Sequence, residues 1–392
     1  RLSLQQTASI DENGAYTGVP AGGNGSADLA FSLAKGKNGQ WRIAATPDGI
    51  VLDAQSFAAE RVFAPYPLQY FDPTWTYLVP DVRWFPRREN TASRIVQSLV
   101  NGKPSAWLTN GVRTAFTGDV ALARNAVTQD SQVAEVALTD AALSADPNTL
   151  ARMRTQLERS LIGLGVLQVK LTVGQRDLNA GAAPAASTTV DSRPLVLTDK
   201  GFGFLSGGAV AAIPGVTTEL ASFPKPIVAI SAASGAQRIA VQAADGVVYA
   251  VADGKVDEMD GRPGLIRPAL DPFGFIWTVP ERSPQSLIAW STSVVPRPIA
   301  GPQDAAQISA IAMSRDGSRL AMAVTAGGQS RVEVAAVTRD DRGAPTAIGP
   351  QSVIAVPPGV VSGLAWLDDT TVGALTSDGS STILLEQPVG GP

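Results

Sequence analysis

Ala312-Met313-Ser314-Arg315-Asp316-Gly317-Ser318-Arg319-Leu320-Ala321 is the stretch that decides the fold of this 392-residue chain. Apolar residues lie on both sides of a polar centre, which is the pattern of two short strands joined by a turn. Asp316-Gly317 suits that turn, because a tight hairpin needs a backbone with positive φ, which glycine adopts without strain. The sequence therefore predicts a β-hairpin with Asp316-Gly317 at its tip.

The same hairpin pattern occurs three more times in the second half of the chain. The matching segments are 227–241 around Ser234-Gly235, 266–279 around Pro272-Phe273-Gly274, and 361–375 around Asp368-Asp369. Their turns recur at spacings of 39, 43 and 53 residues, which bracket the roughly 40 to 50 residues of a four-stranded propeller blade. A further strand follows each hairpin, and residues 194–213 supply part of another blade. We therefore expect a β-propeller over residues 190–392, incomplete at Pro392.

Two helix patterns stand out in the first half of the chain. Residues 91–100 carry apolar side chains at helical spacing and end near Gly102. A longer pattern begins with Asp146 as N-cap and Pro147 as first helical residue, and it ends at Gly165. Strand-like alternation surrounds both helices, so this half of the chain is predicted to be α+β.

The predicted fold class is multidomain and mainly β, with N-terminal α+β segments followed by the propeller. A run of small residues with no periodicity that could bury a face separates the two halves and is predicted to be a linker with nothing to pack against. The predicted parts are residues 1–88, 89–178, the linker 179–189, and the propeller over 190–392.

The amino-acid composition excludes most of the usual catalytic mechanisms. The chain contains no histidine and no cysteine, which are the usual general base, thiol nucleophile and zinc ligands. Its net charge of −4 does not suggest nucleic-acid binding. We predict no catalytic, cofactor-binding or metal-ligating residue in this chain, and therefore a protein that acts through binding surfaces.

Several motifs in the sequence resemble chemical or ligand-binding sites. Ser222 and Lys225 match the Ser-x-x-Lys pattern of serine enzymes, but Pro224 and Pro226 oppose the helix that the pattern needs. The glycines of residues 201–207 do not fit a dinucleotide fingerprint and are interpreted as a β-turn. An acidic cluster lacks calcium-loop spacing and is interpreted as a solvated loop; it consists of Asp253, Asp257, Glu258 and Asp260.

Paired carboxylates could still hydrolyse glycosides without histidine. The candidates are Asp271, Asp316, Asp368 and Asp369. All four lie at turn positions that aspartate favours for structural reasons, which weakens this alternative.

An aromatic passage interrupted by prolines precedes the helices. It includes Tyr70-Phe71-Asp72 and Leu78-Val79-Pro80-Asp81-Val82-Arg83-Trp84. We interpret it as packing between domains, with a carbohydrate platform as the alternative. This passage is followed by the predicted α+β part of residues 89–178 and by the predicted propeller. In this order, the three together resemble the LpqB lipoprotein family of actinobacteria.

The resemblance covers essentially the whole chain and implies both architecture and function. It implies that residues 1–88 are the end of a cone-shaped domain like nuclear transport factor and that residues 89–178 are a GerMN-like unit. It further implies an extracytoplasmic protein, anchored to the outer face of the cell membrane by a lipid attached upstream of Arg1. Such a protein would bind the ectodomain of a sensor kinase and modulate the MtrA–MtrB two-component system in cell-wall homeostasis and division. Peptidoglycan or cell-wall carbohydrate binding and, more remotely, a carboxylate-dependent hydrolase are the alternatives.

Overall fold

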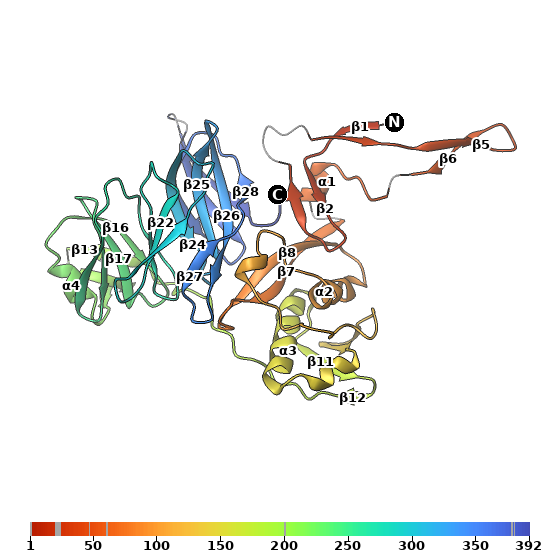
Figure 1. Cartoon of the computed structure of the whole chain (residues 1–392), viewed down its shortest axis with the longest axis horizontal. Coiled ribbons are helices and arrows are strands. Elements are labelled where there is room, and N and C mark those ends of the chain that lie inside the picture. Colours follow the sequence, from red (N-terminus) through yellow and green to blue (C-terminus); the bar gives the residue numbers. More distant parts are fainter. Residues whose placement is uncertain are drawn as a thin grey trace.

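The computed structural model describes residues 2–19, 25–46, 48–59, 62–199, 201–377, 379 and 381–392. Figure 1 shows three parts along the chain: an N-terminal β arm, an α+β unit, and a group of small sheets toward the C-terminus. Among the described residues, no helix is long and apolar enough to cross a membrane. The multidomain, mainly β fold class is confirmed.

The described residues of the N-terminal part form three pairs of antiparallel strands and one short helix. The elements are β1 (Leu2–Gln5), β2 (Ala8–Ile10), β3 (Tyr16–Gly18), β4 (Ser26–Leu29), β5 (Ser32–Lys35), β6 (Trp41–Ala45) and α1 (Ala54–Ala58). β1 pairs with β4, β2 with β3, and β5 with β6. The β5–β6 hairpin forms the end of an arm that projects away from the rest of the molecule (Figure 1).

The middle unit packs a long hairpin and two helices against a four-stranded sheet. Its elements are β7 (Phe63–Phe71), β8 (Leu78–Pro86), α2 (Thr91–Val100), η1 (Thr109–Gly111), β9 (Thr128–Asp130), β10 (Val133–Ala137), η2 (Asp140–Ser144), α3 (Pro147–Leu161), η3 (Ile162–Leu164), β11 (Gln168–Val173) and β12 (Arg176–Asp177). The sheet order is β12-β11-β10-β9, with β10 and β11 parallel. Leu68 of β7, Leu99 of α2 and Leu157 of α3 lie in one buried core. The expected boundary at residue 88 therefore cuts through this core, and the β7–β8 hairpin belongs with the middle unit.

Both predicted helices end where their sequence signals place them. The carboxylate of Asp146 accepts hydrogen bonds from the amides of Asn148 and Thr149, which are otherwise unpaired donors at the start of α3. α3 ends at Leu161 and continues as the 3-10 helix η3, whose C-cap, Gly165, adopts φ 78°, a left-handed conformation that glycine tolerates. The caps thus fix the two ends of the segment formed by α3 and η3, and α3 packs against β7 and β11.

The C-terminal part consists of five antiparallel sheets within the described residues. The first sheet contains β13 (Leu195–Thr198), β14 (Gly201–Ser206) and β15 (Ala209–Ala212), and α4 (Thr217–Ala221) follows it. The second contains β16 (Ile227–Ala232), β17 (Arg238–Ala243), β18 (Val248–Ala252) and β19 (Lys255–Asp260), and the third β20 (Ala269–Leu270), β21 (Ile276–Thr278), β22 (Ser286–Trp290) and β23 (Pro296–Ala300). The fourth contains β24 (Gln307–Met313), β25 (Arg319–Ala326), β26 (Gln329–Arg339), β27 (Pro345–Ile348) and β28 (Ser352–Ala355), and the fifth β29 (Val360–Trp366), β30 (Thr371–Ser377) and β31 (Thr382–Pro388).

Each of the four predicted turns joins the first two strands of one of these sheets. Gly317, at the tip between β24 and β25, has φ 73°, as the tight hairpin requires. The first strands contact one another in succession, from β16 through β20 and β24 to β29. This arrangement is propeller-like, with the first strand of each sheet toward the centre.

The expectation that residues 179–189 have nothing to pack against is wrong. Arg154 on α3 donates a hydrogen bond to the Ala180 carbonyl oxygen at 2.6 Å. The Ala183 amide donates to the Thr155 hydroxyl at 2.8 Å, and the Ala186 amide to the Thr76 carbonyl oxygen at 2.7 Å. The main chain of this segment is therefore held by the middle unit, which small side chains without periodicity could not indicate.

The middle unit also packs directly on the fourth sheet. Ala336 of β26 lies in the buried core of the middle unit, and Trp107 packs against both that core and the core between the fourth and fifth sheets. A Cβ placed on Gly111 would lie 2.9 Å from the Ala336 Cβ, so glycine is required for this close approach. The indole of Trp84 donates to the Gly390 carbonyl oxygen at 2.8 Å. The two halves of the chain therefore share an interface.

Candidate functional site in the central channel

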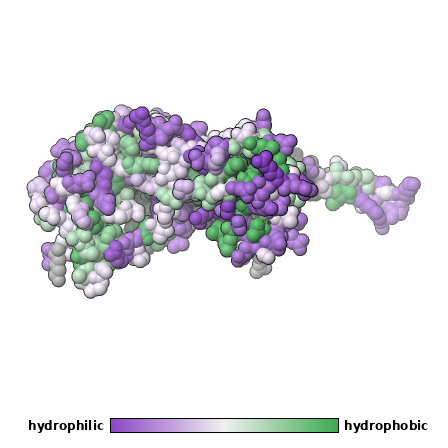
Figure 2. Space-filling view, turned by 90° about the horizontal axis from the view of Figure 1, so that it is seen from below, coloured by the Kyte–Doolittle hydropathy of each residue, from purple (hydrophilic) through white to green (hydrophobic). Residues whose placement is uncertain are grey.

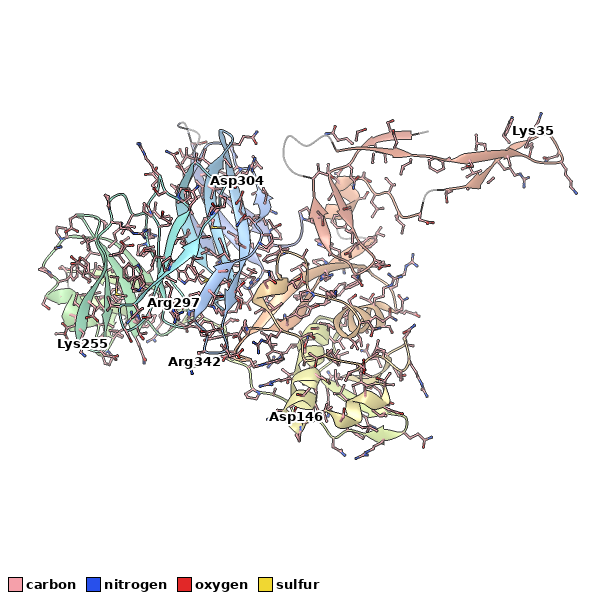
Figure 3. The ribbon with its side chains drawn as sticks, viewed as in Figure 1. Lys35, Asp146, Lys255, Arg297, Asp304 and Arg342 are labelled. Carbon is pink, nitrogen blue, oxygen red and sulfur yellow. The ribbon has the colours of Figure 1, made fainter. Side chains whose placement is uncertain are left out.

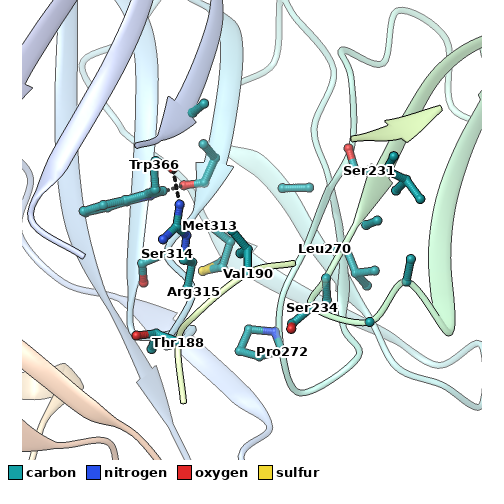
Figure 4. A pocket seen from close by; sticks show the side chains of 18 of the residues that line it. Thr188, Val190, Ser231, Ser234, Leu270, Pro272, Met313, Ser314, Arg315 and Trp366 are labelled. Atoms are coloured by element: carbon teal, nitrogen blue, oxygen red, sulfur yellow. Dashed lines mark hydrogen bonds between the residues drawn. The ribbon is translucent and has the colours of Figure 1, made fainter. Parts of the chain in front are cut away.

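A channel opens where the first strands of the sheets meet. Its wall includes Ser231 of β16, Leu270 of β20, Met313 of β24 and Trp366 of β29 (Figure 4). The cavity has a volume of about 500 Å³, which is in the range of small-ligand sites in proteins. The channel is thus built jointly by repeats that lie far apart in the sequence.

The chain that enters this region from the middle unit completes the wall. Ser187, Thr188, Val190 and Asp191 line the cavity, and Figure 4 shows Thr188 and Val190 between the β24 side and the β20 side. The Thr188 hydroxyl donates to the Asp369 carboxylate at 2.9 Å, which ties the segment to the turn of the fifth sheet. The segment predicted as a linker therefore contributes to the candidate site.

Three arginines give the channel a positive character. Arg193 forms an ion pair with Asp191, and this hydrogen bond lowers the pKa of Asp191 to about 2, so the carboxylate stays ionised. Arg315 donates to the Leu367 carbonyl oxygen at 2.7 Å. Arg267 is exposed and has no hydrogen bond or ion pair to any described residue. Arg267 is thus the cation available to a ligand.

Aromatic side chains supply the apolar part of the wall. The Arg193 guanidinium lies 4.9 Å from the ring centre of Phe204, and that of Arg319 lies 4.5 Å from the ring centre of Trp366. The Trp366 indole donates to the Ala312 carbonyl oxygen at 3.1 Å, which fixes its ring at the cavity. Tryptophan and arginine in fixed positions are typical of surfaces that bind other molecules.

The structure does not bring the candidate carboxylates together in the channel. Asp191 is the carboxylate that lines it among the described residues. Asp271 and Asp316 are fully buried and form ion pairs with Arg339 and Arg319, respectively. These aspartates hold turns and neighbouring sheets, and the geometry of a glycosidase pair is not formed in this cavity.

Ser222 and Lys225 point to different partners. Ser222 follows α4 and its hydroxyl donates to the Thr218 carbonyl oxygen at 3.1 Å. The Lys225 ammonium donates to the Asp245 carboxylate at 2.7 Å. This hydrogen bond, and a second one with Tyr249, raise the pKa of Lys225. Lys225 is therefore a poor general base, and the Ser-x-x-Lys match is coincidental.

The acidic cluster is divided between the two ends and faces of β19. Asp260 is buried and binds Arg262 and the Thr278 hydroxyl. Asp253 lies in the turn before the strand with φ 51°. No group of three or more acidic side chains among the described residues is arranged to hold a metal ion. The described geometry fits a structural role for the buried Asp260 and a solvated position for Asp253 in the turn.

Two further expectations have different outcomes. The glycines of residues 201–207 were predicted to form a turn, but residues 201–206 form strand β14, where a Cβ on Gly203 would lie 2.0 Å from the Ala211 carbonyl oxygen. The aromatic passage does pack between parts of the chain. Trp84 lies against Phe57 of the N-terminal part, and Tyr77 forms an edge-to-face contact with Phe273 of the third sheet.

The channel residues were not predicted from the sequence, although the sequence carries one signal for them. An alanine precedes three of the repeated turns by four residues, at Ala269, Ala312 and Ala365. All three line the channel. Small side chains suit this position because the first strands converge there. An alignment of the repeats on their turns would therefore have located the wall.

Three family models match consecutive parts of the chain. "Lipoprotein LpqB, N-terminal domain" matches residues 1–58, and "Sporulation and spore germination" matches residues 67–179. "Lipoprotein LpqB beta-propeller domain" matches residues 200–388.

Relatives of known name agree with these models. A lipoprotein LpqB of Bifidobacterium longum is 27% identical over 356 residues, which are 86% of this chain and 57% of the relative. One of Thermobifida fusca is 35% identical over 174 residues, which are 43% of this chain and 26% of the relative. The chain thus spans only part of the length of these relatives. Among solved structures, the tandem GerMN domains of GerM from Bacillus subtilis match with a TM-score of 0.26 and 17% identity, covering 48% of this chain and 59% of that chain.

Proposed function

The chain belongs to the LpqB lipoprotein family, and on that premise we propose that it is a non-enzymatic accessory protein on the outer face of the cell membrane. It binds the ectodomain of an MtrB-type sensor kinase and modulates the MtrA–MtrB two-component system. A lipid anchor holds it at the membrane. The central channel is its docking surface.

The channel is the observation that carries this proposal. It combines a rigid frame of sheets, in which a hydrogen bond holds the buried Trp366, with the exposed Arg267, which has no partner among the described residues. Arginine is one of the residue types that dominate binding energy in protein interfaces. Its one carboxylate among the described residues, Asp191, is paired. A surface of this kind supports recognition of a partner.

Calorimetry with the purified ectodomain of the sensor kinase tests the proposal. Arg267→Ala should weaken binding about five-fold or more, because a charged hydrogen bond at an interface is lost. Arg297→Ala is the matched control, since Arg297 is an exposed arginine on strand β23 (Figure 3) and does not line the channel. It should leave the affinity unchanged.

Two results would contradict this assignment. Absence of any heat with the kinase ectodomain would show that this ectodomain is not the partner. Equal weakening by both variants would show that net charge matters and that the channel does not.

With a net charge of −4, binding should depend only slightly on salt.

A further inference from the structure

A second cleft lies between helix α2 and the N-terminal part. Its walls are α2, the turn that contains Glu12 and Asn13, and a loop at Asn125, and its volume is about 730 Å³. Carboxamides predominate in its lining: Asn13, Asn90, Gln97, Asn101 and Asn125. This cleft is separate from the channel and shares no lining residue with it.

The walls of the cleft are fixed by hydrogen bonds. The Gln97 carboxamide donates to the Asn125 carbonyl oxygen at 2.7 Å, and the Val127 amide donates to the Ser93 hydroxyl at 3.0 Å. Both bonds hold the loop against α2. These two walls of the cleft are therefore fixed relative to each other.

Several polar side chains in the cleft remain free. Asn90 occupies the N-cap of α2, where asparagine usually accepts a hydrogen bond from the helix, yet its side chain makes no cap bond. The side chains of Asn13, Asn101 and Asn125 likewise make no hydrogen bond to the described residues. These carboxamides are available to a ligand.

The lining determines the class of ligand. A carboxamide both donates and accepts hydrogen bonds, which matches hydroxyl and amide groups. One cation, Arg94, and one carboxylate, Glu12, balance the charge of the described lining. The aromatic residue of the lining, Phe85, is only 1% exposed, so no apolar anchor is offered. Recognition in this cleft therefore rests on hydrogen bonds rather than on apolar contact.

We infer that this cleft binds a neutral saccharide that carries hydroxyl and acetamido groups. The sugar hydroxyls and the acetamido group exchange hydrogen bonds with the free carboxamides of Asn90 and Asn101, which flank the two ends of α2, and with those of Asn13 and Asn125. This site is independent of the kinase-binding proposal, because its residues lie outside the channel.

Calorimetry of the whole chain with N,N′,N″-triacetylchitotriose tests the inference. Saturable binding is expected. The Asn90→Ala, Asn101→Ala double variant should weaken it about ten-fold or more, because about two hydrogen bonds are lost. Asn148→Ala removes an exposed carboxamide from the first turn of α3, outside the cleft, and should leave binding unchanged. Arg267→Ala in the channel should also leave it unchanged.

The double variant replaces two exposed side chains, and its melting temperature should equal that of the parent chain. Arg94→Ala, a single exposed change on α2, is the second variant and should weaken binding as well. No saturable heat with the trisaccharide, or unchanged affinity in both cleft variants, would overturn the inference. Binding of an acetylated tripeptide in place of the saccharide, lost in the same variants, would overturn it in favour of a peptide site.

Discussion

At the scale of single residues, one buried ion pair joins the third and fourth sheets. The carboxylate of Asp271 lies 2.6 Å from the Arg339 guanidinium, and both side chains are fully buried. Asp271 also accepts hydrogen bonds from the Phe273 and Phe275 amides and from the Trp277 indole. Every strong hydrogen-bonding position of the carboxylate is therefore used, which compensates for its removal from water.

Removing one member of this pair should be costly. Asp271→Ala leaves the Arg339 charge buried beside Gly317 without its counterion and should lower the free energy of unfolding by about 3–5 kcal/mol. Asp341→Ala removes the partner of Arg113 in an exposed ion pair and should cost about 0–1 kcal/mol. Urea unfolding of both variants measures the difference. A loss below about 1 kcal/mol for Asp271→Ala would show that the pair does not support the fold.

Glu333 should make stability depend on pH. It is 2% exposed on β26, and its Oε2 atom has no hydrogen-bond partner among the described residues. Burial raises the pKa of Glu333, and the negative charge of Asp304 adds to this effect (Figure 3), while Arg331 opposes it. The folded state thus keeps the proton longer than the unfolded state does. Stability should fall as pH rises through the range between the ordinary pKa of 4.5 and the raised one.

Glu333→Gln removes the charge and should therefore abolish the loss of stability with rising pH. The variant should gain stability relative to the parent chain as pH rises above the ordinary glutamate pKa of 4.5. Glu386→Gln, an exposed glutamate on β31, is the control and should show no such trend. Thermal unfolding at several pH values measures both. A constant difference between the Glu333 variant and the parent would contradict the expected pH dependence.

At the scale of elements, the β5–β6 hairpin exposes an apolar face. Leu33 lies opposite Ile43, and Trp41 opposite Lys35, so these side chains share one face of the hairpin. Leu33, Trp41 and Ile43 are 58%, 66% and 59% exposed. Figure 2 shows apolar surface on this arm beside a hydrophilic tip. A two-stranded hairpin without further packing is only marginally stable in water. The arm therefore depends on little more than the pairing of β5 with β6 and the turn between them.

Elements with strong local signals could be predicted from the sequence. Caps at Asp146 and Gly165 and the turn at Asp316-Gly317 each fix the backbone through a few neighbouring residues. The strand-like alternation between the two helix patterns includes residues 106–108, yet these residues form a turn before η1. There, Leu108 is buried in the core of the middle unit. Tertiary packing decides such segments, and periodicity over three residues does not report it.

At the scale of the whole molecule, the repeats predicted the propeller-like region, but the sites could not be predicted. The channel brings together Arg193, Arg267 and Arg315 from three segments, and the second cleft brings Asn13 beside α2. Residues that are far apart in the sequence meet at these two sites because of how the sheets and units pack. The interface between the two halves was missed for the same reason, because close approach at Gly111 depends on Ala336 in β26.

This interface should hold the two halves together even when the chain between them is cut. Gly111 touches the fourth sheet, and Trp84 donates to Gly390 near the C-terminus, so contacts on both sides of the cut remain. A protease site inserted at the exposed Ala182 allows cleavage after folding. The two fragments should then elute together in size-exclusion chromatography.

Gly111→Leu should separate these fragments. Its added Cβ would lie 2.9 Å from the Ala336 Cβ and 3.3 Å from the Ser318 carbonyl oxygen, so the surfaces must move apart. Gly163→Leu is the matched control, since a Cβ there has no neighbour within 4 Å, and its fragments should stay together. Separation of the unmodified fragments after cleavage would mean that the covalent connection, and not the packing of the middle unit on β26, holds the halves in place.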